Sequence, residues 1–152
     1  MQKPYRKNAA VIITDGQERV LLCKRIGTLP FVQTVQGGVD EGETHREAAI
    51  RELSEELGLS PDLFEIVAEC PTTMRYEFLE EMLGDHPFLD RFQGQEQTFF
   101  LAKVDQSVVF NLLAHEQEFE KVWWGTPEEL VAEAWSLKRP GIEMALRAFG
   151  FL

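Results

Sequence analysis

Apolar residues recur along the chain in short runs separated by polar breaks, which is the pattern of strands joined by turns. The runs at residues 8–14 and 19–25 flank the turn signal Asp-Gly-Gln-Glu at 15–18, and together they predict a β-hairpin. Segment 107–115 is only partly apolar and fits either a strand or a loop. Further strands are expected at 31–36, 64–70, 72–78, 95–104 and 122–125.

Helix signals occur at three places. Segment 44–57 contains no Gly or Pro, and Gly58 follows it as a C-cap that takes the left-handed conformation. Thr126 precedes Pro and two Glu residues as an N-cap, and a last helix is expected at about 141–149. Residues 79–93 predict an excursion with a short helical turn. Strands around one acidic helix, followed by C-terminal helices, predict an α/β fold with a mixed sheet covered on both faces.

Length, composition and charge limit the class to which the protein can belong. The 152 residues, of which 44% are hydrophobic, are expected to form one domain over 1–152. The net charge of −11 opposes non-specific attraction to nucleic acid or anionic membranes, so a polyanionic substrate must be met by a metal and a few placed cations. No apolar run approaches the length of a membrane span, and no secretory signal pattern is present. Cys23 and Cys70 have no metal-site spacing, and we expect a cytoplasmic protein with buried thiols.

One helix edge carries the candidate chemistry. At 100° per residue, Glu52, Glu55 and Glu56 fall within an arc of about 100°, beside the apolar sector of the same helix. Like charges at spacings of three and four repel each other, and a hard divalent cation such as Mg²⁺ would offset that repulsion. The plain alternative is a solvated acidic face. Gly37, in a pair of adjacent glycines, can bring its carbonyl oxygen close to a metal. Glu43 lies about half a turn from the acidic edge and is assigned to bracing the loop.

The spacing of these residues resembles a known motif. Gly37, Glu43 and segment 51–59 (Arg-Glu-Leu-Ser-Glu-Glu-Leu-Gly-Leu) together resemble the Nudix box, with every fixed position of that 23-residue motif present. The resemblance implies an α/β/α sandwich with a mixed central sheet. It also implies a loop–helix–loop that binds Mg²⁺ or Mn²⁺ and hydrolyses a nucleoside diphosphate linked to another group.

The chemistry assigns roles within the motif. Glu52 and Glu56, one helical turn apart, are expected to be the principal metal ligands, with Glu55 beside them and the Gly37 carbonyl across the loop. Arg51 is expected to pair with Glu55 and orient the cluster, although a plain surface ion pair is the alternative. The resemblance implies that Glu52, which follows the box arginine, is the general base, while any of these carboxylates could take the proton.

Short motifs outside the box resemble the bacterial RNA pyrophosphohydrolases and the related dinucleoside polyphosphate hydrolases. They are Tyr5-Arg6, Gln36-Gly37-Gly38, Arg75-Tyr76, Gly94-Gln95-x-Gln97, Glu118-Phe119 and Lys138-Arg139. By this resemblance Glu118 completes the metal site; otherwise it is one solvated acid in a run with Glu116 and Glu120. The residues implied to contact phosphates or base are Arg6, Arg25, Gln95 and Lys138. Leu137 stands where the family has an aromatic residue, and 32–35 lack the family's Trp-x-x-Pro, so the nucleobase pocket differs.

The function expected from this resemblance is removal of pyrophosphate from the 5′-triphosphate end of RNA, which leaves a 5′-monophosphate and exposes the transcript to decay. Dinucleoside polyphosphates and nucleoside triphosphates are the alternative substrates. A nucleotide-sensing module without turnover is the alternative from another class, but such modules usually lose a box carboxylate, and none is missing here. Monomer and homodimer both remain open.

Overall fold

The computed structural model of the protein describes residues 2–79 and 87–152, apart from the side chains of residues 87 and 88. Within these residues the strands of a single mixed sheet are β1 (Tyr5–Thr14), β2 (Val20–Arg25), β3 (Val32–Gln33), β4 (Val35–Gly38), β5 (Phe64–Glu69), β6 (Met74–Glu77), β7 (Gly94–Val104) and β8 (Phe119–Gly125). The α-helices are α1 (His45–Leu57), α3 (Pro127–Glu133) and α4 (Arg139–Ala148), and the 3₁₀ turns are η1 (Pro61–Leu63) and η2 (Pro87–Arg91).

The sheet is built around two long central strands. β1 and β7 run parallel, from the pair Tyr5↔Gly94 to the pair Thr14↔Lys103. The order across the sheet is β3-β2-β1-β7-β5, with β4 paired to β1, β6 to β7 and β8 to β2. These other pairings are antiparallel. The predicted hairpin is confirmed, because β1 and β2 pair through Thr14↔Val20.

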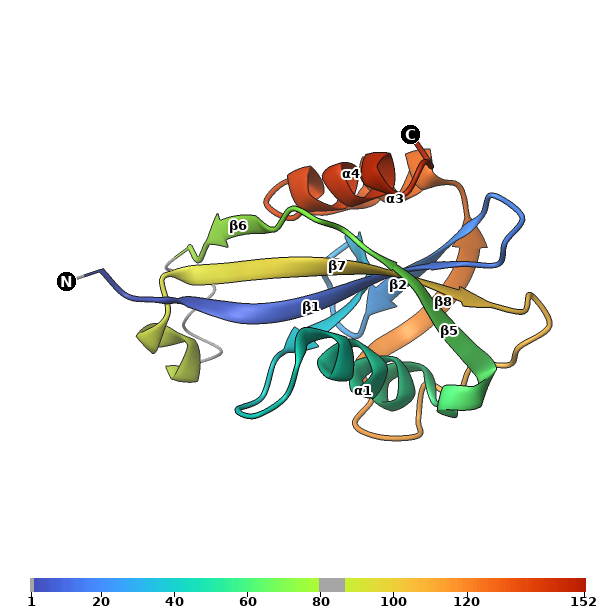
Figure 1. Ribbon diagram of the computed structural model, residues 1–152, viewed down its shortest axis with the longest axis horizontal. Coiled ribbons are helices and arrows are strands. Elements are labelled where there is room, and N and C mark those ends of the chain that lie inside the picture. Colours follow the sequence, from blue (N-terminus) through green and yellow to red (C-terminus); the bar gives the residue numbers. More distant parts are fainter. Residues whose placement is uncertain (1, 80–86) are drawn as a thin grey trace.

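Helices cover both faces of the sheet, as Figure 1 shows: α1 lies on one face, and α3 and α4 lie on the other. Side chains alternate along β1 because successive residues of a strand point to opposite faces. Val11 and Ile13 therefore enter the core beneath α1. Ala10 and Ile12 enter the core beneath α3 and α4. The predicted α/β/α sandwich with a mixed central sheet is confirmed.

Helix α1 begins and ends where its capping residues stand. The Thr44 side chain accepts a hydrogen bond from the backbone N–H of Glu47, and the Glu47 side chain accepts one from the backbone N–H of Thr44. This reciprocal capping box satisfies two donors that the first turn leaves open. At the other end Gly58 has φ 65° and donates its N–H to the Ser54 carbonyl. Because this left-handed conformation suits glycine, the helix stops there.

The structure corrects some predicted boundaries. The strand expected at 31–36 divides at Thr34 into β3, which pairs with β2, and β4, which pairs with β1. Segment 107–115 is a loop. The strand expected from 122 begins at Phe119, and the last helix begins at Arg139. In the excursion at 79–93, η2 supplies a helical turn, while residues 80–86 lie outside the described residues. Within the described residues, no helix has both the length and the apolar character needed to cross a membrane.

Candidate active site

The acidic edge of α1 faces the glycine pair at the end of β4. β4 pairs with β1 through Ala9↔Gly37, which holds the Gly37 backbone beneath the helix. A Cβ atom at Gly37 would overlap the Glu52 carboxylate. Glu52 therefore lies directly against the Gly37 backbone, an approach that a residue with a side chain would block.

Glu56 is the most buried acid of this edge, with 7% of its surface exposed. Its Oε2 atom is buried without a hydrogen-bond partner among the described residues. Burial, and then the nearby charges of Glu52 and Glu118, raise the pKa of Glu56 to about 9. Burial also raises the pKa of Glu52. Buried carboxylates with an unsatisfied oxygen are a donor set suited to a hard divalent cation, so the residues present fit Mg²⁺ or Mn²⁺.

Arg51 connects the acidic edge to the loop before α1. Its guanidinium donates to both carboxylate oxygens of Glu43 at 2.8 and 2.9 Å and to the Gly38 carbonyl at 2.9 Å. It also donates to Glu52 at 2.8 Å and to Glu55 at 3.4 Å. The Arg51 hydrogen bonds are the main cause that lowers the pKa of Glu43 to about 2. The predicted bracing role of Glu43 is confirmed, and the predicted Arg51–Glu55 pair is one of several that Arg51 makes.

Glu118 lies just before β8, where the pairing of β8 with β2 brings it to Arg25. Its carboxylate accepts from the Arg25 guanidinium at 3.1 Å. Its charge also reaches Glu52 and Glu56, and raises the pKa of both. As the side chains stand, no three or more His, Cys, Asp or Glu residues of the described segments are arranged as a metal site. Glu52 and Glu55 are turned to Arg51, and Glu118 is turned to Arg25.

The predicted substrate contacts form two groups beside the acidic edge. Arg6 donates to the Gln95 side chain at 3.2 Å, and its charge interacts with Glu52. Arg25 and Lys138 interact with Glu56 instead. Burial, and then repulsion from Arg25, lower the pKa of Lys138 to about 8 despite attraction to Glu56. The acidic edge therefore has basic side chains next to both of its principal carboxylates.

Sequence reasoning missed a buried polar network behind Arg6. Asn8 is fully buried and donates to Gln36 at 2.6 Å and to Gln95 at 3.0 Å, and Gln95 donates to the Tyr76 hydroxyl. Gln97 donates to Asn8 at 3.2 Å. The available signal was the recurrence of polar residues in strands that are otherwise interior. Buried amides that satisfy one another fix side-chain positions, so this network holds Arg6 and Gln95 in place.

Comparison with known proteins agrees with this geometry. Curated relatives named RNA pyrophosphohydrolase include one from Erythrobacter litoralis, 39% identical over 130 residues, which cover 83% of this chain and 79% of the relative. Another, from Dinoroseobacter shibae, is 33% identical over 148 residues, which cover 96% of this chain and 92% of the relative.

Solved structures of similar fold include the E. coli dihydroneopterin triphosphate pyrophosphohydrolase, with a TM-score of 0.71 and 22% identity over 93% of this chain and 96% of that one. A C. elegans Ap4A hydrolase has a TM-score of 0.70 and 19% identity over 97% and 99%. The family model described as NUDIX domain matches residues 4–144. With the box residues placed on α1 and β4 as described, the chain belongs to the Nudix family.

Proposed function

We propose that the protein is an RNA pyrophosphohydrolase that removes pyrophosphate from the 5′-triphosphate end of RNA and leaves a 5′-monophosphate. The observation that carries this proposal is the acidic edge of α1, where Glu52 lies against the Gly37 backbone, Glu56 is buried one turn away, and basic side chains lie next to both. Relatives of this chain at 33–39% identity carry the name RNA pyrophosphohydrolase. We also propose a cytoplasmic location, because the proposed substrate is a transcript with a triphosphate end.

In the proposed reaction a water oxygen bonds to the α-phosphorus, and the bond from that phosphorus to the bridging oxygen breaks. Pyrophosphate leaves, and the RNA keeps one phosphate. Glu52 takes the proton of the water, since its pKa is raised by burial and its carboxylate lies beside Gly37. Mg²⁺ or Mn²⁺, held by Glu52, Glu55, Glu56, Glu118 and the Gly37 carbonyl, would supply neutralisation of charge on the phosphate oxygens.

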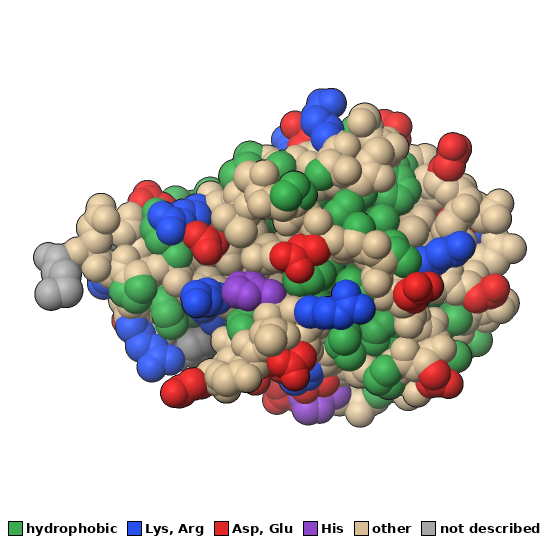
Figure 2. Space-filling model, viewed as in Figure 1, with side chains coloured by type: hydrophobic (Ala, Val, Ile, Leu, Met, Phe, Trp, Pro, Cys, Tyr) green, Lys and Arg blue, Asp and Glu red, His purple; other side chains and the backbone are tan. Residues whose placement is uncertain are grey.

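The polar and basic residues beside the acidic edge are proposed to bind the other parts of the substrate. Arg6, Arg25, Gln95 and Lys138 are proposed to receive the phosphates and the first nucleotide. Figure 2 shows acidic and basic side chains interspersed over the visible face, without an extended basic stripe. With a net charge of −11, such a surface favours contact with the 5′ end alone over contact along a strand.

A direct test is incubation with Mg²⁺ and γ-labelled triphosphorylated RNA, beside diadenosine tetraphosphate and GTP. We expect release of labelled pyrophosphate from RNA at enzyme concentrations that leave the dinucleotide intact. Preferential cleavage of diadenosine tetraphosphate or GTP would mean that this nucleotide, and not RNA, is the substrate. Retention of all substrates would favour a sensing module. Glu128→Gln is a matched control for acid substitutions, because Glu128 is exposed on α3, across the sheet from α1.

A further inference from the structure

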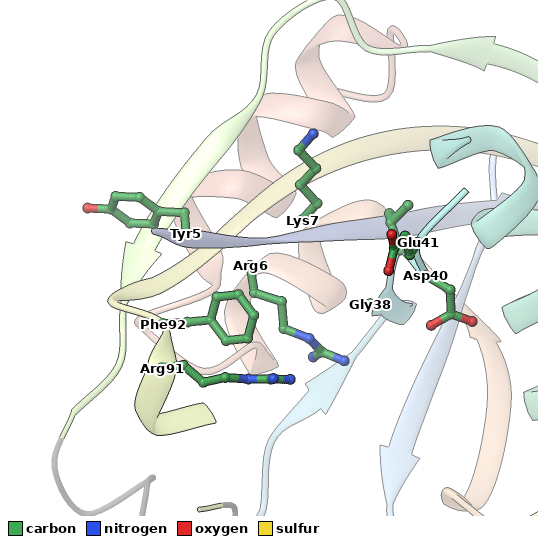
Figure 3. Close-up of a pocket in the computed structure, with 9 residues that line it drawn as sticks. Tyr5, Arg6, Lys7, Gly38, Asp40, Glu41, Arg91 and Phe92 are labelled. Carbon is green, nitrogen blue, oxygen red and sulfur yellow. The ribbon is translucent and has the colours of Figure 1, made fainter. Parts of the chain in front are cut away.

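A cavity of about 470 Å³ opens beside the glycine pair, between the start of β1, the loop after β4 and the end of η2. Figure 3 shows Arg6 and Arg91 reaching into it from β1 and from η2, with both guanidinium groups directed toward the side where Gly38 lies. A Cβ atom at Gly38 would overlap the Arg6 guanidinium. The cavity is therefore next to the backbone that carries Gly37, and two cations from separate elements meet in it.

Basic and acidic side chains both line the cavity: the lining includes Arg6 and Arg91, and also Asp40 and Glu41. Burial lowers the pKa of Arg6, repulsion from Arg91 adds a smaller effect in the same direction, and Tyr76, Glu52 and Asp40 oppose both. Lys7 also belongs to the lining, but Figure 3 shows its side chain on the other side of β1. Of the lining acids, Asp40 lies 3.6 Å from Arg51 and also attracts Arg6, and Glu41 is exposed. Two guanidinium groups that face the same cavity can bind one anion between them through charge-assisted hydrogen bonds.

Arg91 is held in position by the backbone around it. The N–H of Phe92 donates to the Leu89 carbonyl at 2.9 Å, and the N–H of Gln93 donates to the Pro4 carbonyl at 2.8 Å. The Arg91 guanidinium lies over the Phe92 ring, 5.4 Å from its centroid. Among residues 2–79 and 87–152, Arg91 makes no ion pair with a carboxylate. A guanidinium that is held in position and has no carboxylate partner within the described part of the chain suits recognition of a phosphate.

We propose that Arg91, together with Arg6, binds the terminal γ-phosphate of a triphosphorylated 5′ end. This inference rests on the proposed function and specifies which part of the substrate this cavity takes. The α-phosphate must lie at Glu52 and Glu56, and the second basic pair, Arg25 and Lys138, lies toward Glu56. Arg6 lies toward Glu52, so the phosphates that leave extend from Glu52 into the cavity.

The first test compares one RNA carrying a 5′-triphosphate with the same RNA carrying a 5′-diphosphate, which lacks the γ-phosphate. For Arg91→Ala we expect kcat/KM on the triphosphate to fall about 10- to 100-fold, as for one charge-assisted hydrogen bond, and kcat/KM on the diphosphate to fall by less than about threefold. Arg91→Lys should restore part of the loss, since it keeps the charge without the fork. Arg147→Ala, which removes an exposed arginine on α4 across the sheet from α1, should change kcat/KM on neither substrate. Equal losses on both RNAs, or no loss on either, would overturn the proposal.

The second test needs no turnover. Calorimetric titration of the full chain with inorganic pyrophosphate should give a Kd that Arg91→Ala weakens about tenfold or more and Arg147→Ala leaves unchanged. Arg91 is exposed, so its replacement should leave the fold intact. If neither RNA is hydrolysed by the unsubstituted protein, the proposed function fails while the pyrophosphate titration still decides the anion site. Equal pyrophosphate affinity in the protein and in Arg91→Ala would overturn the anion site itself.

Discussion

Individual carboxylates on one helix edge occupy different environments, and the difference separates their roles. Glu56 is buried with an unpartnered oxygen, whereas Glu52 accepts a hydrogen bond from Arg51 and touches the Gly37 backbone. Glu55 is one-third exposed and accepts the longest of the Arg51 hydrogen bonds. We therefore propose that Glu52 receives the proton from water and that Glu56 holds the cation.

Replacing Glu52 tests this assignment. Glu52→Gln keeps the size of the side chain but removes its basicity, so we expect kcat to fall by roughly 10²- to 10⁴-fold or more while the protein stays folded. Circular dichroism and steady-state kinetics on triphosphorylated RNA provide the measurement. Glu128→Gln is the control and should keep full activity. Near-normal turnover by Glu52→Gln would remove Glu52 from the base role.

Lys138 gives the site a pH dependence of its own. Because burial lowers the pKa of Lys138 to about 8, its ammonium loses a proton as the pH rises past 8, and its attraction for phosphate weakens. We expect KM for triphosphorylated RNA to increase between pH 7.5 and pH 9.5. Lys138→Arg should have a flatter KM profile, because a guanidinium stays charged in this range. An identical increase in both proteins would assign the pH effect to another group.

At the scale of the element, the loop and helix of the Nudix box are held by contacts at both ends of α1. Arg51 and Glu43 hold the loop against the helix, and Gly58 ends the helix beside the loop at Asn111. The acidic edge keeps its position relative to Gly37 only while these contacts persist. Stability of this element and geometry of the site are therefore linked.

Two glycines with positive φ allow the C-cap of α1 to be tested. At Gly58 (φ 65°) a Cβ atom would lie 2.5 Å from the Asn111 carbonyl oxygen, whereas at Gly150 (φ 85°) it would meet nothing within 4 Å. Gly150→Ala should lower the free energy of unfolding by about 1–2 kcal/mol through backbone strain alone. Gly58→Ala should lower the free energy of unfolding by about 1–3 kcal/mol more than Gly150→Ala does, because its Cβ atom overlaps Asn111. Urea unfolding measures both, and equal losses would mean that the Asn111 loop moves aside.

The Glu43–Arg51 contact predicts a stability difference that depends on pH. The pKa of Glu43 is about 2 in the folded protein against an ordinary value of 4.5, so its contribution is present above pH 4.5 and is lost as the pH falls toward 2. Glu43→Gln should therefore be less stable than the unsubstituted protein at pH 7, and the difference should shrink between pH 4.5 and pH 3. Urea midpoints at several pH values measure it, with exposed Glu41→Gln as the control. A difference independent of pH would contradict the ionic contact.

Local signals explain how much of these elements the sequence predicted. The helix over 44–57, its caps and the hairpin depend on neighbouring residues, so they could be predicted. The division of the strand at Thr34 could not, because it depends on which strand each half pairs with. The Glu118–Arg25 contact arises from pairing of β8 with β2, residues far apart in the chain. No local pattern in the sequence indicated a role for Arg91, because its position depends on the backbone of η2 and on contact with the chain at Pro4.

At the scale of the whole molecule, the sandwich brings distant segments to one end of α1. β1 supplies Arg6, β2 supplies Arg25, and the chain just before α4 supplies Lys138. These few cations stand on a protein of net charge −11. The fold thus concentrates positive charge at the site while the remaining surface repels a long polyanion.

This arrangement predicts how the rate depends on salt and on RNA length. If Arg6, Arg25, Arg91 and Lys138 supply the phosphate contacts, they neutralise about three or four phosphate charges. The value of log(1/KM) should then fall with log[salt] at a slope of about −2 to −3, as for single strands. RNAs of 5 and 30 nucleotides with the same 5′ sequence should have the same kcat/KM, because the acidic surface offers nothing to the distal nucleotides. Steady-state kinetics at several salt concentrations on both lengths measure both quantities. A steeper slope for the longer RNA would reveal contacts along the strand and contradict recognition of the end alone.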